Sequence, residues 1–595
     1  MCGIVGSLGD FNARDVVLKG LERLEYRGYD SAGLALLHEN EITVFKDTGR
    51  VANLMSITPE VISHIGIGHT RWATHGKVTQ YNSHPHYSMS KRFILVHNGV
   101  IENARELKET RLQTCDFRTE TDSEVVAYLI EHYFEKYGVV SDAIRKTMSL
   151  IEGSYALVII DTQNNNKLYA AKNKSPLLIG KSDEGFIVGS DIMPLLDHCK
   201  KFIPLEDGTF VEMEKNGDYT INLYDIIGKK RDYELHDIVV NSNDIGKGNY
   251  EHYMLKEIDE QASVVRRLIS EYFDDEKIVL DPKIEKIFKG RDRIYILAAG
   301  TSAHAGFVAK GYFEKIAGIP TEVHISSEFI YDTPVLTENP LFIYISQSGE
   351  TADSRACLVK TKKMGYPSLT ITNVATSTLA RESDAYLDIF AGPEIAVAST
   401  KAYVASIAVL LILAKSLGEY DLDVKTELSK AASIMDDLVN KKDYINKLAK
   451  ELLTKRNAFF IGRGFDYYVA MEAALKLKEI SYIQAEGFAA GELKHGTIAL
   501  IEEGTPVTAI ITNKSINLNT RSNLSEVESR GAKTMVISMK SISESTDQIV
   551  IEDIDPLLAP MVAIIPCQLL SYYGAIIQGN DVDKPRNLAK SVTVE

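Results

Sequence analysis

The sequence is poor in the residues that mark secreted, metal-binding or membrane proteins. Its 595 residues include five cysteines, odd in number and without CxxC spacing, so neither a disulfide framework nor a zinc site is predicted. The chain opens without a basic segment or a useful apolar segment, so no signal peptide is expected. The longest apolar run, residues 404–414, is about half a membrane span. We therefore expect a protein of the reducing cytoplasm that does not act on membranes.

The sequence is also short of positive charge. Lys and Arg number 66 against 82 Asp and Glu, which gives a net charge of -16. Such an excess of acid disfavours nucleic acid and anionic membranes as partners, so an anionic ligand must be held by local groups. Hydrophobic residues at 45% and charged residues at 25% are ordinary for a globular protein. The length predicts about three or four domains.

The two halves of the chain have different patterns. Residues 1–240 alternate short apolar strands with few helices, which indicates an α+β sandwich. A polar, glycine-bearing linker follows at 241–250. Beyond it strands and helices alternate strictly, which favours parallel sheets covered by helices on both faces. The expected strands of the first half are Gly3–Val5, Gly33–Leu37, Ile65–His69, Phe93–His97, Tyr155–Asp161, Leu168–Ala171 and Phe186–Ser190, and the expected helices are Asp15–Leu24 and Ser123–Tyr137.

The second half looks duplicated. The segment 343–351 is echoed at 509–514, and 294–302 is echoed at 459–464. We predict two related, doubly wound subdomains at 251–425 and 426–580. A C-terminal tail of 581–595 follows them.

Cys2 is a candidate N-terminal nucleophile. If Met1 is removed, a free α-amine with a reference pKa of about 7.7 to 8 stands next to the thiol and can serve as its base. A lone Met-Cys start is more often a small hydrophobe that opens a buried strand. The residues further along the chain decide between these interpretations.

Hydroxyl-rich segments in the first copy suit a phosphate. Ser346, Ser348 and Thr351 stand between a strand and a helix, where N–H donors and the positive end of the helix dipole attract anions. A serine-rich helix cap is the alternative. The second copy clusters Lys476, Glu479 and His495, groups that move protons next to a carbonyl, although a solvated helix face has the same composition.

The first half offers groups for an amino acid. Arg71 suits a carboxylate and Asp122 an ammonium. Asn98-Gly99 could be a hairpin turn or could present N–H groups to an oxyanion. Histidines 69, 75, 84, 86 and 97 lack the paired spacing and cysteine partners of a metal site, so no metal is expected.

Taken together, these segments resemble the glutamine–fructose-6-phosphate aminotransferase (isomerising) family, the glucosamine-6-phosphate synthases. The resemblance covers the whole chain and is carried by an ordered set of motifs: CGIVG, LEYRGYDSAG (24–33), GHTRWATHG (68–76), NSHPH (82–86), HNGVIEN (97–103), TETDSE, HYMLKEIDEQ (252–261), GTS, SQSGETADS, VASTKAY, KLKEISYIQAEGFAAGELKHG and PRNLAKSVTVE. It implies an α/β chain, in which an N-terminal Ntn-hydrolase αββα glutaminase domain precedes two doubly wound parallel-sheet sugar-isomerase (SIS) subdomains.

The resemblance also implies an activity and its residues. Fructose 6-phosphate and glutamine would become glucosamine 6-phosphate and glutamate, in the first step of amino-sugar synthesis, by a cytoplasmic homodimer that uses no cofactor and no metal. The catalytic residues would be Cys2, Asn98, Gly99, Glu479, His495 and Lys590; glutamine would contact Arg71, Thr74, His75, His84 and Asp122; Trp72, the only tryptophan, would gate an ammonia channel; and Thr301, Ser302, Ser346, Gln347, Ser348, Thr351 and Lys476 would bind the sugar phosphate.

Two alternatives remain at this point. One is a glutamine amidotransferase with another phosphosugar acceptor, and the other is a non-enzymatic sugar-phosphate sensor. A sensor needs neither Cys2 nor Lys590. Comparing glucosamine 6-phosphate formation with bare glutamate release separates all three possibilities.

The start of the chain gives the first prediction. Because both the amine and the thiol of Cys2 are needed, the mature protein should lack Met1, and Cys2→Ala should abolish glutamine hydrolysis. Sugar isomerisation and the use of added ammonia should survive. Intact-mass measurement checks the processing, and fully retained Met1 in an active preparation would contradict the assignment.

Overall fold

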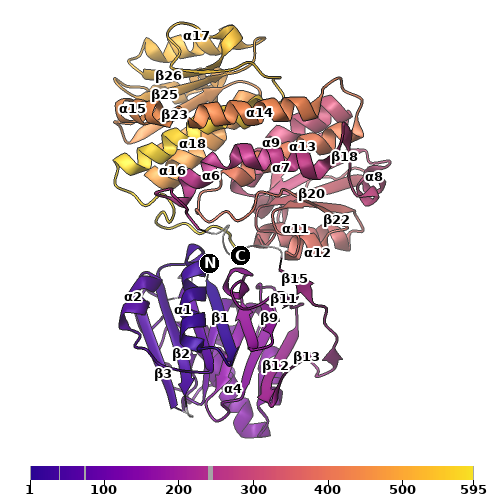
Figure 1. Cartoon of the computed structure of the whole chain (residues 1–595), viewed down its shortest axis with the longest axis vertical. Helices are drawn as coiled ribbons and strands as arrows, with labels where there is room; N and C mark the ends of the chain where they lie inside the picture. Colours follow the sequence, from indigo (N-terminus) through magenta and orange to yellow (C-terminus); the bar gives the residue numbers. More distant parts are fainter. Residues whose placement is uncertain (1, 39–40, 73–75, 239–245, 594–595) are drawn as a thin grey trace. The chain divides into compact units, whose positions relative to one another are not determined.

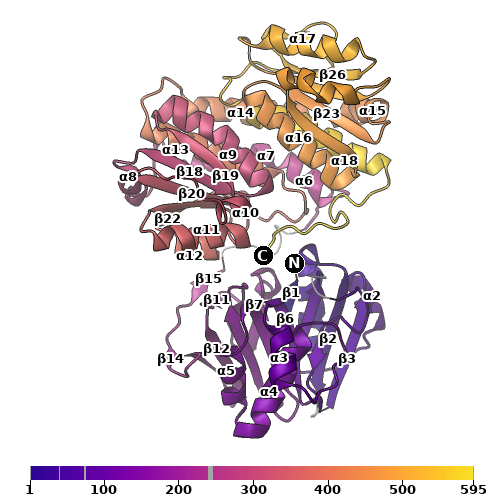
Figure 2. The same cartoon turned by 180° about the vertical axis from the view of Figure 1, so that it is seen from behind.

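The computed structural model describes residues 2–38, 41–72, 76–238 and 246–593. The chain divides into two compact units. One comprises Met1–Asp244 together with Ser591–Glu595, and the other comprises Ile245–Lys590. Figures 1 and 2 show the two units from opposite sides.

The first unit is a four-layered sandwich of two antiparallel sheets between helices. In the described residues one sheet has the strand order β15-β11-β9-β10-β1-β4-β2-β3 and the other β14-β13-β12-β8-β7-β6-β5. The bounds are β1 Gly3–Gly9, β2 Ser31–His38, β3 Glu41–Thr48, β4 Ile65–Arg71, β5 His86–Tyr87, β6 Phe93–Ile101, β7 Gly153–Asp161, β8 Lys167–Asn173, β9 Leu178–Ser182, β10 Gly185–Gly189, β11 Lys201–Pro204, β12 Thr209–Asn216, β13 Asp218–Asp225, β14 Lys230–Arg231 and β15 His236–Asp237, with helices α1 Ala13–Leu24, α2 Val51–Ile57, α3 Ala104–Arg111, α4 Ser123–Tyr137 and α5 Val140–Met148.

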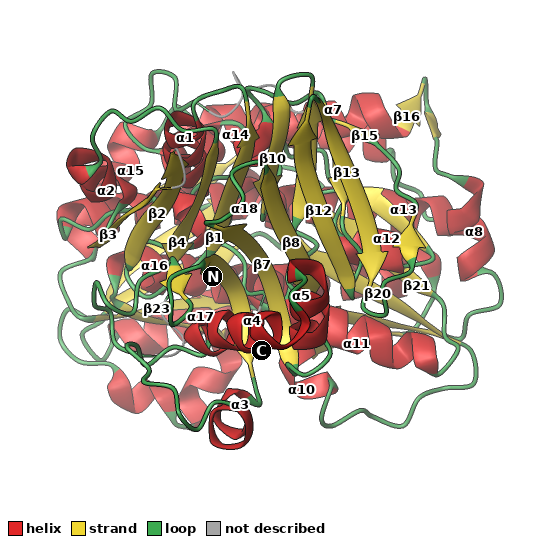
Figure 3. Cartoon of the chain, turned by 90° about the horizontal axis from the view of Figure 1, so that it is seen from below, coloured by secondary structure: helices red, strands yellow, loops and turns green. Residues whose placement is uncertain are grey.

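Two hydrophobic layers hold this sandwich together. The inward faces of the sheets share a core that includes Ile4, Ile67, Val96 and Val158. Helix α4 packs with its neighbour α5 over the outer face of the second sheet, and Figure 3 shows the two helices side by side. Helix α1 covers β1 and β4 of the first sheet. The order helix, sheet, sheet, helix confirms the αββα prediction. Each predicted strand and helix of this half lies within an observed one, except that the strand predicted at Phe186–Ser190 ends one residue earlier, at Gly189.

The second unit contains two parallel sheets. Their strand orders in the described residues are β19-β18-β20-β21-β22 and β24-β23-β25-β26-β27. The first sheet uses β18 Arg293–Ala298, β19 Thr321–Ile325, β20 Pro340–Ser346, β21 Ser368–Thr372 and β22 Ala385–Asp388, with α8 Pro282–Phe288, α9 Gly300–Tyr312, α10 Ser326–Phe329, α11 Ala352–Lys363, α12 Thr378–Glu382 and α13 Lys401–Leu417; the second uses β23 Asn457–Gly462, β24 Gln484–Ala489, β25 Pro506–Ile511, β26 Lys533–Met539 and β27 Ile549–Ile551, with α14 Val424–Val439, α15 Lys442–Leu452, α16 Phe465–Ser481, α17 Asn517–Glu528 and α18 Ala559–Ile577. A short hairpin of β16 Phe273–Asp274 and β17 Lys277–Ile278, and helices α6 Tyr253–Asp259 and α7 Gln261–Tyr272, precede them.

The matching strand orders confirm two related, doubly wound subdomains. In each sheet the second strand lies on one side of the first strand, and the third, fourth and fifth strands lie on its other side. The strand order therefore reverses between β18 and β20 and between β23 and β25. Ligands of open parallel sheets bind outside the carboxyl ends of the strands at such a reversal. The segments that follow β18 and β20 are therefore the expected binding edge.

The two subdomains share one hydrophobic core, in which the most apolar helices are buried. Helix α13 contains the long apolar run of the sequence, and residues 401–414 are all buried. Helix α18 is long and apolar enough to cross a membrane by composition, and 83% of its apolar window is buried inside the protein. It packs against α14, α15 and α16. This helix therefore serves as a core element between layers.

Candidate active sites

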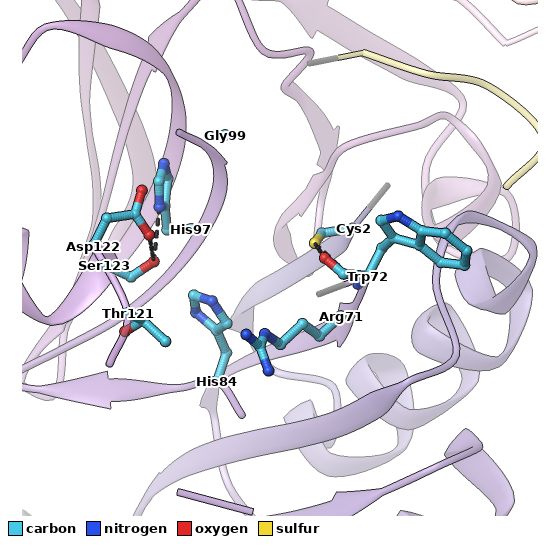
Figure 4. Close-up of a pocket in the computed structure, with 9 residues that line it drawn as sticks. All are labelled: Cys2, Arg71, Trp72, His84, His97, Gly99, Thr121, Asp122 and Ser123. Carbon is cyan, nitrogen blue, oxygen red and sulfur yellow. Dashed lines mark hydrogen bonds between the residues drawn. The ribbon is translucent and has the colours of Figure 1, made fainter. Parts of the chain in front are cut away.

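A pocket at the start of β1 gathers the predicted glutamine-binding residues. It is lined by Cys2, Arg71, Trp72, His84, His97, Gly99, Thr121, Asp122 and Ser123 (Figure 4). Cys2 precedes β1, Arg71 ends the neighbouring strand β4, and Asp122 stands at the start of α4. The antiparallel pairing of β1 with β4 brings residues about 70 positions apart together at the same end of these two strands. Thr74 and His75 lie outside the described residues.

The thiol of Cys2 is held by the backbone of Trp72. The Trp72 N–H donates to Cys2 Sγ at 3.2 Å, and the thiol lies 3.5 Å from the Trp72 carbonyl oxygen. Burial raises the pKa of the Cys2 thiol, while the hydrogen bond from Trp72 and the charge of Arg71 act in the opposite direction. A buried thiol of this kind needs a base next to it to become a nucleophile.

Asn98 and Gly99 stand beside this thiol. The side-chain amide of Asn98 donates to the Cys2 carbonyl oxygen at 3.0 Å, which places the amide at the nucleophile. Gly99 has φ +137, and a Cβ there would meet the Ser154 carbonyl oxygen at 2.0 Å, so only glycine fits. Both residues belong to β6, so the Asn98-Gly99 pair is no hairpin turn.

The Asp122 carboxylate is held by two neighbours. The Ile101 N–H donates to its Oδ2 at 2.7 Å, and Ser123 Oγ lies 3.4 Å from its Oδ1. Ser123 in turn lies 2.8 Å from His97 Nδ1. The relay from His97 through Ser123 was not predicted from the sequence. His97 and Ser123 belong to the sequence motifs HNG (97–99) and TDS (121–123), but nothing in the sequence indicates that these two motifs contact each other.

Three histidine rings lie in contact: His69 stacks on His84, and His86 meets His84 edge to face. The rings of His69 and His84 are 3.9 Å apart and those of His84 and His86 are 4.4 Å apart. Burial lowers the pKa of all three, that of His69 to about 3, so the rings are uncharged near neutral pH. Within the described residues, no group of three or more His, Cys, Asp or Glu side chains is arranged to hold a metal ion.

A second candidate site lies at the carboxyl ends of β18 and β20. Ser346 ends β20 and Thr351 caps α11, and their hydroxyl oxygens are 2.8 Å apart. The Gly349 N–H donates to Ser346 Oγ at 3.0 Å, and the Glu350 N–H donates to Ser348 Oγ at 3.2 Å. Gly349 has φ +63, and a Cβ there would collide with Ser377, so the loop needs glycine to turn this tightly. Thr301 and Ser302, in the first turn of α9, follow the adjacent strand β18.

The second subdomain has a carboxylate at the matching position. Gly300 has φ +55 and Gly464 has φ +58, and each stands at the start of a helix. Aligning these two glycines pairs Ser302 with Asp466. Aligning Pro340 with Pro506, which begin β20 and β25, pairs Ser346 with Thr512. Asp466 accepts hydrogen bonds from the Thr512 N–H, at 2.9 Å, and from its hydroxyl. Burial raises the pKa of Asp466 to about 7. This carboxylate replaces a hydroxyl, so the second copy lacks the pair of hydroxyl groups, Ser302 and Ser346, that the first copy has at this position.

Lys476 on α16 lies at the centre of a buried charge cluster. Its Nζ is 2.7 Å from Glu479 Oε2, 3.4 Å from Glu472 Oε1 and 2.9 Å from Thr301 Oγ1. Glu472 also contacts His304 Nδ1 at 2.7 Å. The charges of Glu472 and Glu479 outweigh the cost of burial and raise the pKa of Lys476 to about 12. The cluster joins α16 of the second subdomain to α9 of the first.

Lys590 is buried although it lies six residues from the end of the chain. Its side chain is 3% exposed, and its Nζ donates to Glu394 Oε2 at 2.5 Å and to the Ala396 carbonyl oxygen at 2.8 Å. Glu394, in the loop before α13, is 0% exposed and was not predicted from the sequence. The only feature of the sequence that points to Glu394 is that this carboxylate stands in an otherwise apolar segment, residues 391–398. The negative charge of Glu394 also contributes to raising the pKa of Lys476.

The remaining predicted residues differ in their surroundings. His495 ends a short 3-10 helix, Ala490–His495, and its side chain is exposed. No hydrogen bond or ion pair within the described part of the chain links it to the cluster around Lys476. Ser302 and Gln347 stand at the hydroxyl-rich edge by their place in the chain.

Comparisons with known proteins identify the domains of the chain. A glutamine amidotransferase domain model matches residues 69–197, and a SIS domain model matches residues 286–416 and 451–577. The glutamine–fructose-6-phosphate aminotransferases (isomerising) of Listeria monocytogenes and Geobacillus kaustophilus are each 53% identical to this chain over its whole length and theirs. The solved C-terminal domain of the glucosamine-fructose-6-phosphate aminotransferase of Francisella tularensis is 40% identical, covers 57% of this chain and all of its own, and superposes with a TM-score of 0.55.

A glutamine-hydrolysing domain joined to two SIS domains defines the class, an amidotransferase with a phosphosugar acceptor. Within that class the residue identity over the full length decides the family. The chain belongs to the glutamine–fructose-6-phosphate aminotransferase (isomerising) family.

The hydroxyl-rich loop gives the second prediction. Ser346→Ala combined with Thr351→Ala should raise the KM for fructose 6-phosphate at least about tenfold, because each hydrogen bond to a charged group contributes about 1.5–3 kcal/mol. Glutaminase activity measured without sugar should stay nearly unchanged. Steady-state kinetics of both half-reactions test this, and an unaltered KM for the sugar would place the phosphate elsewhere.

Proposed function

We propose that the pocket around Cys2 hydrolyses glutamine. The Cys2 thiolate attacks the carboxamide carbon, the Asn98 amide and the Gly99 N–H stabilise the oxyanion, and the free α-amine of processed Cys2 acts as base. Arg71 binds the substrate carboxylate and Asp122 its ammonium, with Thr74, His75 and His84 around them. The close approach of Asn98 to Cys2 and the fixed orientation of the Asp122 carboxylate support these roles.

The ammonia released there serves the second half-reaction. The activity of the family is the transfer of the glutamine amide nitrogen to fructose 6-phosphate, with isomerisation to glucosamine 6-phosphate. We assign the gate of the ammonia path to Trp72. Its backbone contacts the nucleophile and its ring lies edge-on to Tyr29, with centroids 5.9 Å apart, so the ring belongs to the residue next to the point where ammonia is released.

The site around Lys590 performs the sugar chemistry in this proposal. Ser302, Ser346, Gln347, Ser348 and Thr351 bind the phosphate with Thr301 beside them, Lys590 forms an imine with the open-chain ketose, Glu479 moves the proton between C1 and C2, and Lys476 holds Glu479. The observation that carries the proposal is the burial of Lys590, because a terminal lysine is exposed unless the fold has a use for it.

His495 supports a homodimer. Its side chain is exposed and lies outside the cluster of its own chain, yet the resemblance to the family implies that it assists ring opening of the sugar. A symmetric dimer meets both conditions if each chain lends His495 to the site of the other. We place this enzyme in the reducing cytoplasm, where its five free cysteines are stable.

The tail gives the third prediction. Borohydride in the presence of fructose 6-phosphate should attach the sugar covalently to Lys590, and Lys590→Arg, which cannot form an imine, should lose synthase activity. Peptide mapping identifies the modified residue. Glutaminase activity is the control for folding. An adduct on Lys476 or Lys494 would contradict the catalytic role of Lys590 and would leave the tail only a covering role at the site.

A fourth prediction concerns the dimer. Purified mixed dimers of a His495→Ala chain and a Lys590→Ala chain should retain about half of the wild-type activity, because one of their two symmetric sites is complete. Each homodimeric variant should be inactive. Inactive mixed dimers would show that both residues serve the site of their own chain.

A further inference from the structure

The mechanism proposed for Lys590 requires a proton acceptor, because an ammonium ion is no nucleophile. Lys590 reaches two oxygen atoms, those of Glu394 and Ala396, and only the first belongs to a group that can take up a proton. The inference below rests on the proposed function of Lys590. It concerns the two carboxyl groups beside it, Glu394 and Glu257, which the sequence motifs do not assign.

Glu394 is held in place by more bonds than an ordinary ion pair needs. Its Oε1 accepts the Thr400 N–H at 2.9 Å and the Ala402 N–H at 3.1 Å, which are free donors at the start of α13. Its Oε2 accepts the Ser399 hydroxyl at 2.9 Å and Lys590 Nζ. The carboxylate is therefore aimed at the reacting nitrogen by a helix N-terminus.

Glu257 approaches the same segment from the other side. Its Oε1 accepts the N–H groups of Ile395, at 2.5 Å, and Ala396, at 3.1 Å. Its Oε2 is buried without a hydrogen-bond partner among the described residues. The side chain is 1% exposed. The Glu257 carboxyl thus binds the backbone of Ile395 and Ala396, next to Glu394. The carbonyl oxygen of Ala396 in turn accepts a hydrogen bond from Lys590.

One oxygen of the Glu257 carboxyl lacks the partners that would stabilise a negative charge. Its Oε2 has no hydrogen-bond partner among the described residues, and the nearby Lys401 is paired with Glu260 at 2.6 Å. Burial raises the pKa of Glu257 to about 8, with Glu394 raising it further and Lys590 and Lys401 opposing the rise. Glu257 therefore carries a proton near neutral pH, and Glu394 is the carboxylate.

We propose that Glu394 is a catalytic base that takes a proton from Lys590, and that Glu257 is a positioning residue that must be protonated for this transfer. One proton passes from the Lys590 ammonium to Glu394, and the neutral amine attacks C2 of the open-chain ketose. The carbinolamine hydroxyl then receives this proton and leaves as water. The product is a protonated imine, so charge and atoms balance without another reactant.

The loss of both charges offsets the low basicity of Glu394. Burial by itself raises the pKa of the Glu394 carboxyl, but the charge of Lys590 and the hydrogen bonds that the carboxylate accepts lower it overall to about 2. When the proton moves, both charges vanish together, and the desolvated site no longer has to hold either ion. A second negative charge on Glu257 would bind the ammonium more tightly and oppose the step.

The experiment compares two variants of the full-length enzyme with the same chemical change. Glu394→Gln should slow borohydride trapping of fructose 6-phosphate on Lys590 about 100-fold, the usual contribution of a general base. Glu257→Gln, which mimics a protonated carboxyl, should trap at nearly the wild-type rate at pH 7. It should also lose the fall of synthase kcat/KM that the wild-type enzyme shows above about pH 8.

The outcomes separate this inference from the function on which it rests. A wild-type adduct on another lysine refutes the role of Lys590 itself. An adduct on Lys590 that forms as fast or faster in Glu394→Gln refutes the base, since the carboxylate would then only restrain the amine. An unchanged alkaline limb in Glu257→Gln refutes its role. Normal glutaminase activity and normal sugar KM show that each variant is folded, and Glu394→Asp, which keeps a carboxylate, should recover part of the rate.

Discussion

The isomerase unit is organised around one buried carboxylate. Glu394 binds two N–H groups at the start of α13, a serine hydroxyl and the ammonium of Lys590. An unpaired charge on the buried Glu394 would cost several kcal/mol. The loop that contains Glu394, the start of α13 and the tail that contains Lys590 must therefore fold against one another. Asp583 adds to this set: its carboxylate accepts the Tyr253 and Met254 N–H groups at the start of α6, and its carbonyl oxygen accepts the Val397 N–H. Lys590, the proposed catalytic lysine, thereby obtains a fixed position.

Duplication supplied the scaffold, and divergence gave the copies separate tasks. The first copy keeps Ser302 and Ser346 at the reversal of its strand order, where hydroxyl and N–H donors suit a phosphate. The second has Asp466 and Thr512 there, already bonded to each other. Its contribution comes from α16, whose Lys476 contacts Thr301 of the first copy and Glu479 of its own helix. The sugar site that we propose thus combines groups from both copies.

Much of the fold followed from local patterns. The alternation of apolar residues predicted β1, β6 and α4, because a half-buried strand repeats every two residues and a helix about every 3.6. The hairpin of β12 and β13 was overlooked, although Asn216-Gly217 between the two strands is a strong turn signal and Gly217 has φ +77. Its strands mix apolar and charged residues, since one face is exposed, and this hid the period.

The sequence alone determined the residue types and therefore the chemistry: a thiol beside the chain's start, hydroxyls before α11, and a lysine in the tail. Only the tertiary structure decided which of them meet. It joined Asn98 to Cys2, His97 to Ser123, and Glu394 to Lys590, 196 residues apart. It also left His495 on the surface. The physical reason is that hydrogen bonds and ion pairs between distant residues depend on strand order and burial, which no spacing along the chain records.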